Sequence, residues 1–339
     1  MKAFIKAVEY HLPEARLDND QLAREFPDWT PEKIEAKTGI ICRRVAAPEE
    51  CSSDLAVAAA QKLFSTGVCQ PQDIDYVVLC TQSPDYFLPT TACLVQHRLG
   101  LPTTCGALDF NLGCSGFVTG LGLVKGLIET RQARNVLLIT AETYSKFIHP
   151  GDKSVRALFG DAAAATLVSA KESDVDLIGP FVFGTDGSGA NNIIVPTGGT
   201  RRAFNPAAPV TEDSGGNRRT ENNLFMNGPE IFNFTLRVIP PMVSELIARA
   251  GLKAEDVDHW VFHQANRFML EHLRKKLGVP PEKFPILMSH CGNTVSSTIP
   301  IALCELQKQG KLAAGQTLAL VGFGVGYSWT GAMVKWGVK

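Results

Sequence analysis

The chain has 339 residues, of which 45% are hydrophobic and 20% are charged, a composition typical of a globular protein with a large buried core. Its 33 Lys and Arg residues nearly balance its 34 Asp and Glu residues, so no overall basic charge exists to hold nucleic acid or an anionic membrane. Nine cysteines, with neither a Cys-x-x-Cys pair nor a zinc-like spacing, argue against a disulfide framework and a metal site. The N-terminal segment lacks the apolar core of a signal peptide and no run is long and apolar enough for a membrane span, so we expect a cytoplasmic protein.

Short apolar runs alternate with helical patterns along the chain, and this alternation predicts an α/β architecture with buried sheets. Strands are predicted at 76–80, 135–142, 259–263 and 317–324, and helices at 52–67 and 266–278. Between them, the polar segment 198–223 is predicted to be a long surface loop, which is more often functional or mobile than idle. Its arginines could meet phosphates or simply form a solvated face: Arg201, Arg202, Arg218 and Arg219.

A weak internal repeat indicates a duplication, although two unrelated βα units could also produce it. The segment QDIDYVVLC at 72–80 resembles EDVDHWVFH at 255–263, 183 residues later. We therefore expect two halves, at 1–175 and 176–339, related by pseudo-twofold symmetry.

Three candidate catalytic residues occupy turns or strand ends in these halves. Cys114 lies between a strand-like run and a glycine-rich helix-like run, where the positive end of a helix favours a thiolate, so it is a candidate nucleophile. Packing at a crowded helix start is the alternative interpretation. His263 ends a predicted strand and Asn293 stands in a Gly-Asn-Thr turn, and either could be structural. With symmetric halves, the three converge at the strand ends, where α/β ligand sites form.

These residue types together suit thioester chemistry. Cysteine accepts an acyl group, and uncharged His and Asn donors stabilise the enolate formed when a malonyl thioester loses carbon dioxide. The glycines at 322, 324 and 326 precede a strand-like run, whereas dinucleotide binding requires a helix there. We expect a hairpin, either purely structural or with an amide of Val325 that forms an oxyanion hole with the amide of Cys114.

Seven motifs run along nearly the whole chain: KTGIICRRVAAPEE, FLPTTACLVQHRLG, DFNLGCSGFVTGL, FGDAAAATLV, HQAN, HCGNT and GFGVGYSW. In these motifs and their order the chain resembles the β-ketoacyl-acyl-carrier-protein synthase III group of the thiolase superfamily. This resemblance implies a duplicated αβαβα fold in five layers, a homodimer, and no permanently bound cofactor. It also implies that an acyl thioester primes Cys114, after which malonyl-carrier protein condenses with loss of carbon dioxide, with His263 and Asn293 as the decarboxylation pair.

The donor site departs from the family pattern. Lys33 and Lys37 stand where family members that take acetyl-coenzyme A have the Trp and the Arg of a Trp-Ile-x-x-Arg motif, although Trp29 lies four residues before Lys33. In those members the Trp and a later Arg, at the position of Lys153 here, flank the adenine. Lysine can neither stack nor bind bidentately as these residues do, so the donor stays open between acyl-coenzyme A and acyl-carrier protein. Further departures are Lys153 for a later Arg, Pro229 for an Asn of the pantetheine tunnel, and Phe268 in an Arg position, with Arg267 one place early.

Leu88 stands where the family often has a Phe that reaches into the partner's acyl pocket. A smaller side chain leaves more room, so we predict an acyl donor longer than acetyl. The remaining assignments follow the resemblance: substrate binding by Asn266, Phe232, Lys37 and Lys153, and docking of an acidic carrier protein by Arg267, Arg274, Lys275 and Lys276.

Two other functions stay open. One is acyl transfer from Cys114 to an alcohol or amine without decarboxylation, for which His290 and Cys291 beside Asn293 leave some room. The other is a noncatalytic partner in a condensing heterodimer, although such partners typically lose the nucleophile. The leading hypothesis is a decarboxylating condensing enzyme in fatty-acid initiation or in a specialised lipid or secondary-metabolite pathway.

Overall fold

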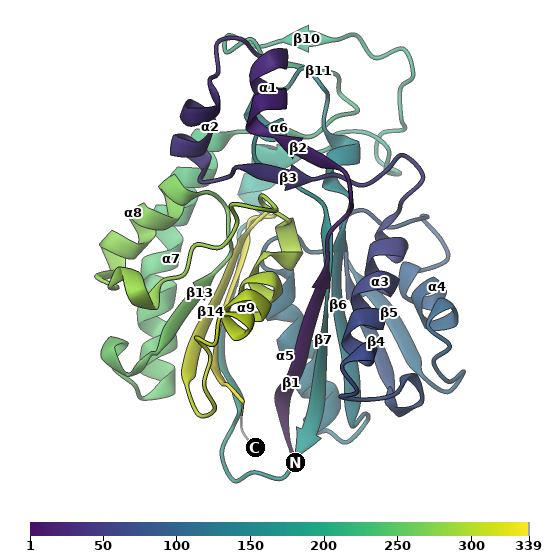
Figure 1. The fold of residues 1–339 in the computed structure, drawn as a ribbon, viewed down its shortest axis with the longest axis vertical. Helices are drawn as coiled ribbons and strands as arrows, with labels where there is room; N and C mark the ends of the chain where they lie inside the picture. The colour runs from purple at the N-terminus through teal and green to yellow at the C-terminus, as the bar shows by residue number, and fades with distance from the viewer. Residues whose placement is uncertain (338–339) are drawn as a thin grey trace.

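The computed structural model describes residues 1–337 and contains two sheets packed side by side with a helical layer between them (Figure 1). The first sheet has the strand order β1-β7-β6-β4-β5, in which β4, β5 and β6 are parallel and β1 and β7 run antiparallel to their neighbours. Its strands are β1 (Lys2–His11), β4 (Tyr76–Cys80), β5 (Gly106–Phe110), β6 (Asn135–Glu142) and β7 (Ala162–Lys171).

The second sheet has the order β13-β14-β15-β8, with β13 and β14 parallel and the other pairs antiparallel. Its strands are β8 (Ile178–Thr185), β13 (His259–Phe262), β14 (Thr317–Gly324) and β15 (Ser328–Lys335). The strands predicted at 76–80, 135–142 and 317–324 have the bounds of β4, β6 and β14, and the strand predicted at 259–263 ends one residue earlier, at Phe262.

Helices complete five layers, which confirms the αβαβα fold. Helix α5 (Gly116–Glu129) and helix α9 (Thr298–Lys308) lie between the sheets, and the core around them includes buried residues of both sheets. Helices α3 (Ser52–Ser65) and α4 (Thr91–Arg98) cover the outer face of the first sheet, and α7 (Gly228–Ala250) and α8 (Arg267–Leu277) cover that of the second. The helices predicted at 52–67 and 266–278 are therefore α3 and α8.

Small elements gather beyond one end of the two sheets (Figure 1). The interval 198–223 contains a short hairpin of β10 and β11, so it is not loop throughout. The small elements are β2 (Arg16–Asp18), β3 (Cys42–Arg44), β9 (Ile193–Ile194), β10 (Thr211–Glu212), β11 (Arg218–Arg219), β12 (Phe225–Met226), α1 (Asn19–Glu25), α2 (Pro31–Thr38) and α6 (Lys153–Arg156), with 3₁₀ turns that include η2 (Tyr144–Phe147), η3 (Gly187–Asn192) and η6 (Val295–Ser297).

Close packing explains two of the glycines of α5, Gly116 and Gly120. A Cβ at Gly116 would lie 2.2 Å from the sulfur of Cys80 on β4, and one at Gly120 would lie 2.8 Å from Leu138 on β6. The helix therefore approaches the strands more closely than an alanine would permit, although each interior glycine costs about 1 kcal/mol of helix propensity relative to alanine. This contact fixes the N-terminal end of α5, and with it Cys114, against the strand ends.

Helix α7 is, among residues 1–337, the one helix long and apolar enough to cross a membrane by length and composition. It packs on β8, β14 and β15, as the core helix of a globular protein does. Length and composition are therefore weak evidence of a membrane span for this helix.

Candidate active site

Cys114 lies in the turn between β5 and α5, immediately before the helix, and is 6% exposed. Hydrogen bonds from the backbone amides of Cys114 and Val325 reach its thiol and act to lower the pKa. Burial, followed by the charge of Glu142, outweighs them and raises the pKa to about 12. The resting thiol is therefore protonated, in contrast to the thiolate that the helix end alone favours, because burial removes the water that would solvate a charge.

His263 follows β13 directly and is 2% exposed. Its Nδ1 lies 2.7 Å from the hydroxyl of Thr298, the first residue of α9, and its ring meets the edge of Phe323 at a centroid distance of 5.6 Å. Burial lowers the pKa of His263 to about 3, so the imidazole is uncharged at neutral pH.

Asn293 is fixed by backbone contacts on both sides of its turn. Its N–H donates to the carbonyl of Leu158 at 2.9 Å, and its carbonyl accepts from the N–H of Gly160 at 3.0 Å. The side-chain Oδ1 accepts from the amide of Val295 at 3.0 Å, which turns the Nδ2 donor group the other way. The preceding Gly292 has φ +77°, and a Cβ there would lie 2.9 Å from the carbonyl oxygen of Leu158, so only glycine fits.

These three side chains, which the sequence predicted to converge, line one cavity of about 70 Å³, here named the nucleophile cavity. Phe323, Gly324 and Val325 form part of its wall. At roughly 15 Å³ for each water-sized group, the volume holds about five such groups. An acyl group of a few carbons fits here, and a longer one must extend beyond this cavity.

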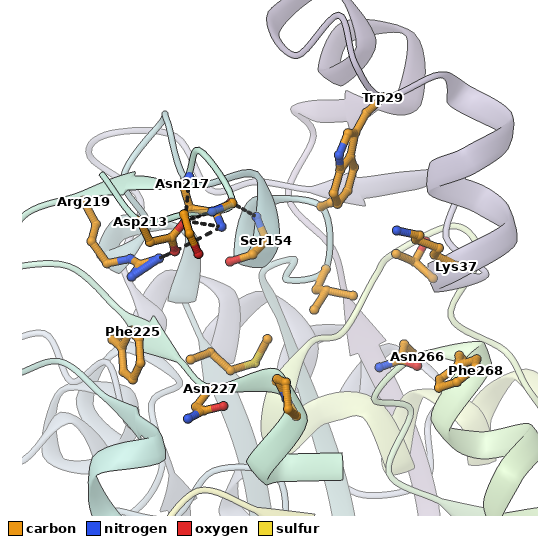
Figure 2. A pocket seen from close by; sticks show the side chains of 18 residues that line it. Trp29, Lys37, Ser154, Asp213, Asn217, Arg219, Phe225, Asn227, Asn266 and Phe268 are labelled. Carbon is orange, nitrogen blue, oxygen red and sulfur yellow. Dashed lines mark hydrogen bonds and ion pairs between the residues drawn. The ribbon is translucent and has the colours of Figure 1, made fainter. Parts of the chain in front are cut away.

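A larger cavity of about 870 Å³, here named the entrance cavity, shares Leu158, Met226 and Asn266 with the nucleophile cavity. Figure 2 shows Trp29 and Lys37 on one side of it and Asp213, Asn217 and Arg219 on the other. The ammonium of Lys37 lies 5.5 Å from the centroid of the Trp29 ring. An aromatic ring and a cation thus stand at this mouth, although Lys33 occupies the sequence position of the family's Trp.

The hairpin wall of the entrance cavity is held by ion pairs. The guanidinium of Arg219 donates to Asp152 at 2.8 Å and to Asp213 at 2.6 Å. Asp213 also accepts three hydrogen bonds from Asn217, and hydrogen bonds and the nearby Arg219 keep its pKa below the usual range against the opposing effect of burial. Of the four arginines considered for phosphate binding, Arg219 is therefore already paired, and Arg202 forms an ion pair with Glu221.

A third cavity of about 700 Å³, here named the outer cavity, shares Tyr144, Ile193 and Val325 with the nucleophile cavity. Tyr86 and Phe87 stand at its rim, 61% and 85% exposed. Leu88 is 83% exposed and does not line any of these three cavities of this chain.

The other predicted residues are less closely grouped. Asn266 lines both the nucleophile and entrance cavities, whereas Phe232 lines neither and packs on His272 and on Phe268 of the entrance cavity. Lys153 begins α6 and lines none of the three cavities.

Among the residues predicted to dock a carrier protein, Arg274 is engaged by Glu271 and by the carbonyl of Val279. Lys276 donates to the carbonyl of Leu236. Arg267 and Lys275 are exposed on α8.

Sequence reasoning missed two functional candidates, Thr298 and Glu142. Glu142 is the one charged residue of the mostly apolar strand β6 and is fully buried, which is the signal that could have drawn attention to it. Thr298 carried no such signal, because its contact with His263 joins segments 35 residues apart. Within residues 1–337, no group of three or more His, Cys, Asp or Glu side chains could hold a metal ion.

Comparisons with known proteins agree on one family. The family described as 3-Oxoacyl-[acyl-carrier-protein (ACP)] synthase III matches residues 108–187, and its C-terminal family matches 247–336. The chain is 36% identical over 326 residues to the Beta-ketoacyl-[acyl-carrier-protein] synthase III of Caldanaerobacter subterraneus subsp. tengcongensis, covering 96% of this chain and 95% of the relative.

Solved structures give the same result. A crystal structure of a 3-oxoacyl-(acyl-carrier-protein) synthase III is 56% identical, with a TM-score of 0.98 and coverage of 99% of this chain and 100% of the other. The 3-oxoacyl-(acyl-carrier protein) synthase from Burkholderia xenovorans LB400 is 38% identical, with a TM-score of 0.90 and coverage of 99% and 94%.

Proposed function

Because the chain belongs to the β-ketoacyl-[acyl-carrier-protein] synthase III family, we propose that it condenses an acyl thioester primer with malonyl-acyl-carrier protein, with loss of carbon dioxide, in fatty-acid initiation. It is an enzyme of the 3-oxoacyl-acyl-carrier-protein synthase III type. The observation that carries the proposal is that a buried thiol, a neutral imidazole and an oriented amide line one small cavity. No permanently bound cofactor is needed, since both substrates are thioesters.

Acyl loading is the first step and uses Cys114. Its sulfur attacks the thioester carbonyl of the primer, the bond from that carbon to the carrier sulfur breaks, and the thiol proton leaves on the carrier thiol. The amides of Cys114 and Val325, which reach the sulfur in the resting site, stand beside the oxyanion that forms. They would serve as an oxyanion hole, for which Val325 supplies only its backbone and so can replace a glycine.

Decarboxylation is the second step and uses His263 and Asn293. The hydroxyl of Thr298 lies 2.7 Å from Nδ1 of His263 and also donates to the carbonyl of Val295 at 3.1 Å. We propose that in the reacting complex it donates to Nδ1 instead, which leaves Nε2–H to donate to the malonyl thioester oxygen. Nδ2–H of Asn293 donates to the same oxygen. The bond to the carboxyl carbon then breaks, carbon dioxide leaves, and the enolate attacks the acyl carbon, releasing Cys114. A neutral imidazole suits this role, because it donates without surrendering a proton.

The donor's acyl chain meets a partition made by Tyr144, Ile193 and Val325, the side chains shared by the nucleophile and outer cavities. We propose that acyl groups longer than acetyl pass this partition and lie in the outer cavity, whose apolar lining includes Phe147 and Leu224. The chain-length preference thus depends on this partition as well as on the residue at position 88.

A homodimer fits the exposed apolar rim of the outer cavity. Tyr86, Phe87 and Leu88 follow one another in sequence, and all are more than half exposed in the single chain. A second copy would cover them and close the outer cavity, which otherwise leaves a large apolar patch in water. We further propose that acyl carrier protein approaches past Arg267 and Lys275, and the cytoplasmic location stays a prediction.

Intact-protein mass spectrometry tests the reaction. The wild-type chain and Cys114→Ala are mixed with acetyl-, octanoyl- and aryl-thioesters on coenzyme A and on carrier protein, and malonyl-carrier protein is then added. We expect an adduct on the wild type only, discharged with release of carbon dioxide, and larger for octanoyl than for acetyl donors. An adduct that malonyl-carrier protein does not discharge would favour acyl transfer to an alcohol or amine. If no donor acylates Cys114, the protein is instead a noncatalytic partner in a condensing heterodimer.

A further inference from the structure

Glu142 is a buried carboxyl near the reacting side chains that the two steps above do not use. It ends β6 and is 0% exposed. Its oxygens accept the amide proton of Gln82 at 3.1 and 3.3 Å and contact the hydroxyls of Ser83 at 3.1 Å and Ser296 at 2.9 Å. All of these partners are neutral. A buried carboxylate without a cation beside it is costly, so the carboxyl favours its protonated form.

One partner of Glu142, Ser296, lies in the turn after Asn293, and another, Gln82, follows β4 and packs on the turn that carries Cys114. On one side, the amide oxygen of Gln82 accepts from the Tyr144 hydroxyl at 2.8 Å and packs against Gly113, where a Cβ would lie only 2.5 Å from it. Gly113 directly precedes Cys114. A displacement of Gln82 would therefore move the turn that presents the nucleophile.

On the other side, Ser296 lies in η6, one residue after Val295, whose amide holds Oδ1 of Asn293 at 3.0 Å. One carboxyl thus connects the turn before the nucleophile with the turn that orients the decarboxylation amide. These turns are more than 150 residues apart in sequence and belong to the two halves of the fold.

The electrostatic surroundings of Glu142 include no compensating charge. Burial raises its pKa to about 8, against the lowering effect of Ser296, Gln82 and Ser83, and the carboxyl of Asp161 raises it further. After burial, the charge of Glu142 is the next largest cause that raises the pKa of Cys114. It also raises the pKa of the buried groups Cys80 and Tyr144. The titratable groups that face Glu142 are therefore all acids, and each opposes the ionisation of the others.

We infer that Glu142 is a positioning residue that acts as a neutral acid: uncharged, it holds both catalytic turns and permits Cys114 to ionise for acyl loading, and as an anion it suppresses the thiolate. This inference rests on the proposed role of Cys114 as the nucleophile. Because the two groups share a low-dielectric site, they titrate as a coupled pair. The reactivity of Cys114 then rises less steeply with pH once Glu142 ionises.

Site-resolved alkylation tests this coupling. The rate at which iodoacetamide modifies Cys114 is followed by peptide mass spectrometry between pH 6 and 10 in the wild type, in Glu142→Gln and in Glu305→Gln. Glutamine keeps the shape of the side chain and removes the titration. We expect the ratio of the Glu142→Gln rate to the wild-type rate to be near one at pH 6.5 and to rise to about fivefold at pH 9, toward the limit of about tenfold that corresponds to one unit of thiol pKa.

Glu305→Gln is the matched control, because that carboxyl acts on Cys291 and Cys304 and should leave the Cys114 profile unchanged. A ratio that stays constant with pH would assign Glu142 to packing alone and overturn the inference. If Glu142→Gln does not fold, the wild type still decides: its profile should depart from a single ionisation near pH 8, and a single-ionisation curve would refute the coupling. If neither iodoacetamide nor any acyl donor modifies Cys114, the proposed role of Cys114 as the nucleophile is wrong.

Discussion

Gly324 is the position where one added methyl group should most directly disable the nucleophile. It ends β14, and a Cβ there would lie 2.9 Å from both Cβ and Sγ of Cys114. Ordinary contacts at such positions begin near 3.4 Å, so the two side chains must separate by about half an ångström. The backbone of Gly324 is not in the left-handed region, so alanine is compatible with the strand and the strain falls on Cys114.

We expect Gly324→Ala to slow acyl loading by about 10- to 100-fold, since misplacing a reacting group by 1 Å can cost about 100-fold. The same overpacking should cost about 1–3 kcal/mol of stability. Time-resolved intact-protein mass spectrometry measures the rate of acyl loading, and thermal unfolding measures the stability of the variant. The control is Gly187→Ala on η3, where no heavy atom would lie within 4 Å of the new Cβ. Wild-type loading in Gly324→Ala would refute the placement of the thiol against this strand.

Two predictions concern the decarboxylation step. Replacing Thr298 by Val removes the hydroxyl 2.7 Å from Nδ1 of His263, so the release of carbon dioxide from malonyl-carrier protein should fall about tenfold, as expected for one lost hydrogen bond. Acyl loading should change little, and Thr298→Ser should restore activity. Equal losses in both steps would contradict this prediction. Because burial lowers the pKa of His263 to about 3, the imidazole stays neutral from pH 5 to 8, and decarboxylation should show no acid limb near pH 6.5; an inflection there would refute a neutral donor.

The sheets could be predicted from the sequence because buried strands are continuous apolar runs. The bounds of β4, β6 and β14 coincide with runs at 76–80, 135–142 and 317–324, since a strand covered on both faces reads as a nearly continuous apolar run. Convergence of Cys114, His263 and Asn293 on one cavity was also predictable. Parallel strands end at one edge of a sheet, and the duplicated pattern places Cys114 before α5 and Asn293 before α9, the two helices of the central layer.

Features that depend on loop conformation or on burial were not predictable. Trp29 lines the entrance cavity with Lys37 although the aligned position holds Lys33, because a loop has no periodicity from which to infer where its side chain points. The protonation of Cys114 depends on how completely the surrounding elements exclude water, which the helix end alone does not determine. The contacts of Glu142 join segments that are distant in sequence and carry no motif.

The proposed reaction takes its nucleophile from the predicted half 1–175 and its decarboxylation pair from the predicted half 176–339. It therefore requires these halves to hold a fixed register. Apolar layers alone constrain this register weakly, because side chains such as Leu and Met repack after a small shift at low cost. A buried hydroxyl that loses its partner costs about 1–3 kcal/mol, so polar pairs at the interface penalise the same shift much more strongly. Four such pairs of side chains join the two halves. The hydroxyl oxygens are 2.7 Å apart in Ser115–Ser328, 2.7 Å apart in Thr119–Thr330 and 2.8 Å apart in Thr140–Ser297, and Ser296 donates to Glu142. The first and last of these pairs directly adjoin the turns of Cys114 and Asn293, so the polar contacts between the halves constrain the relative positions of the reacting groups more directly than the apolar core does.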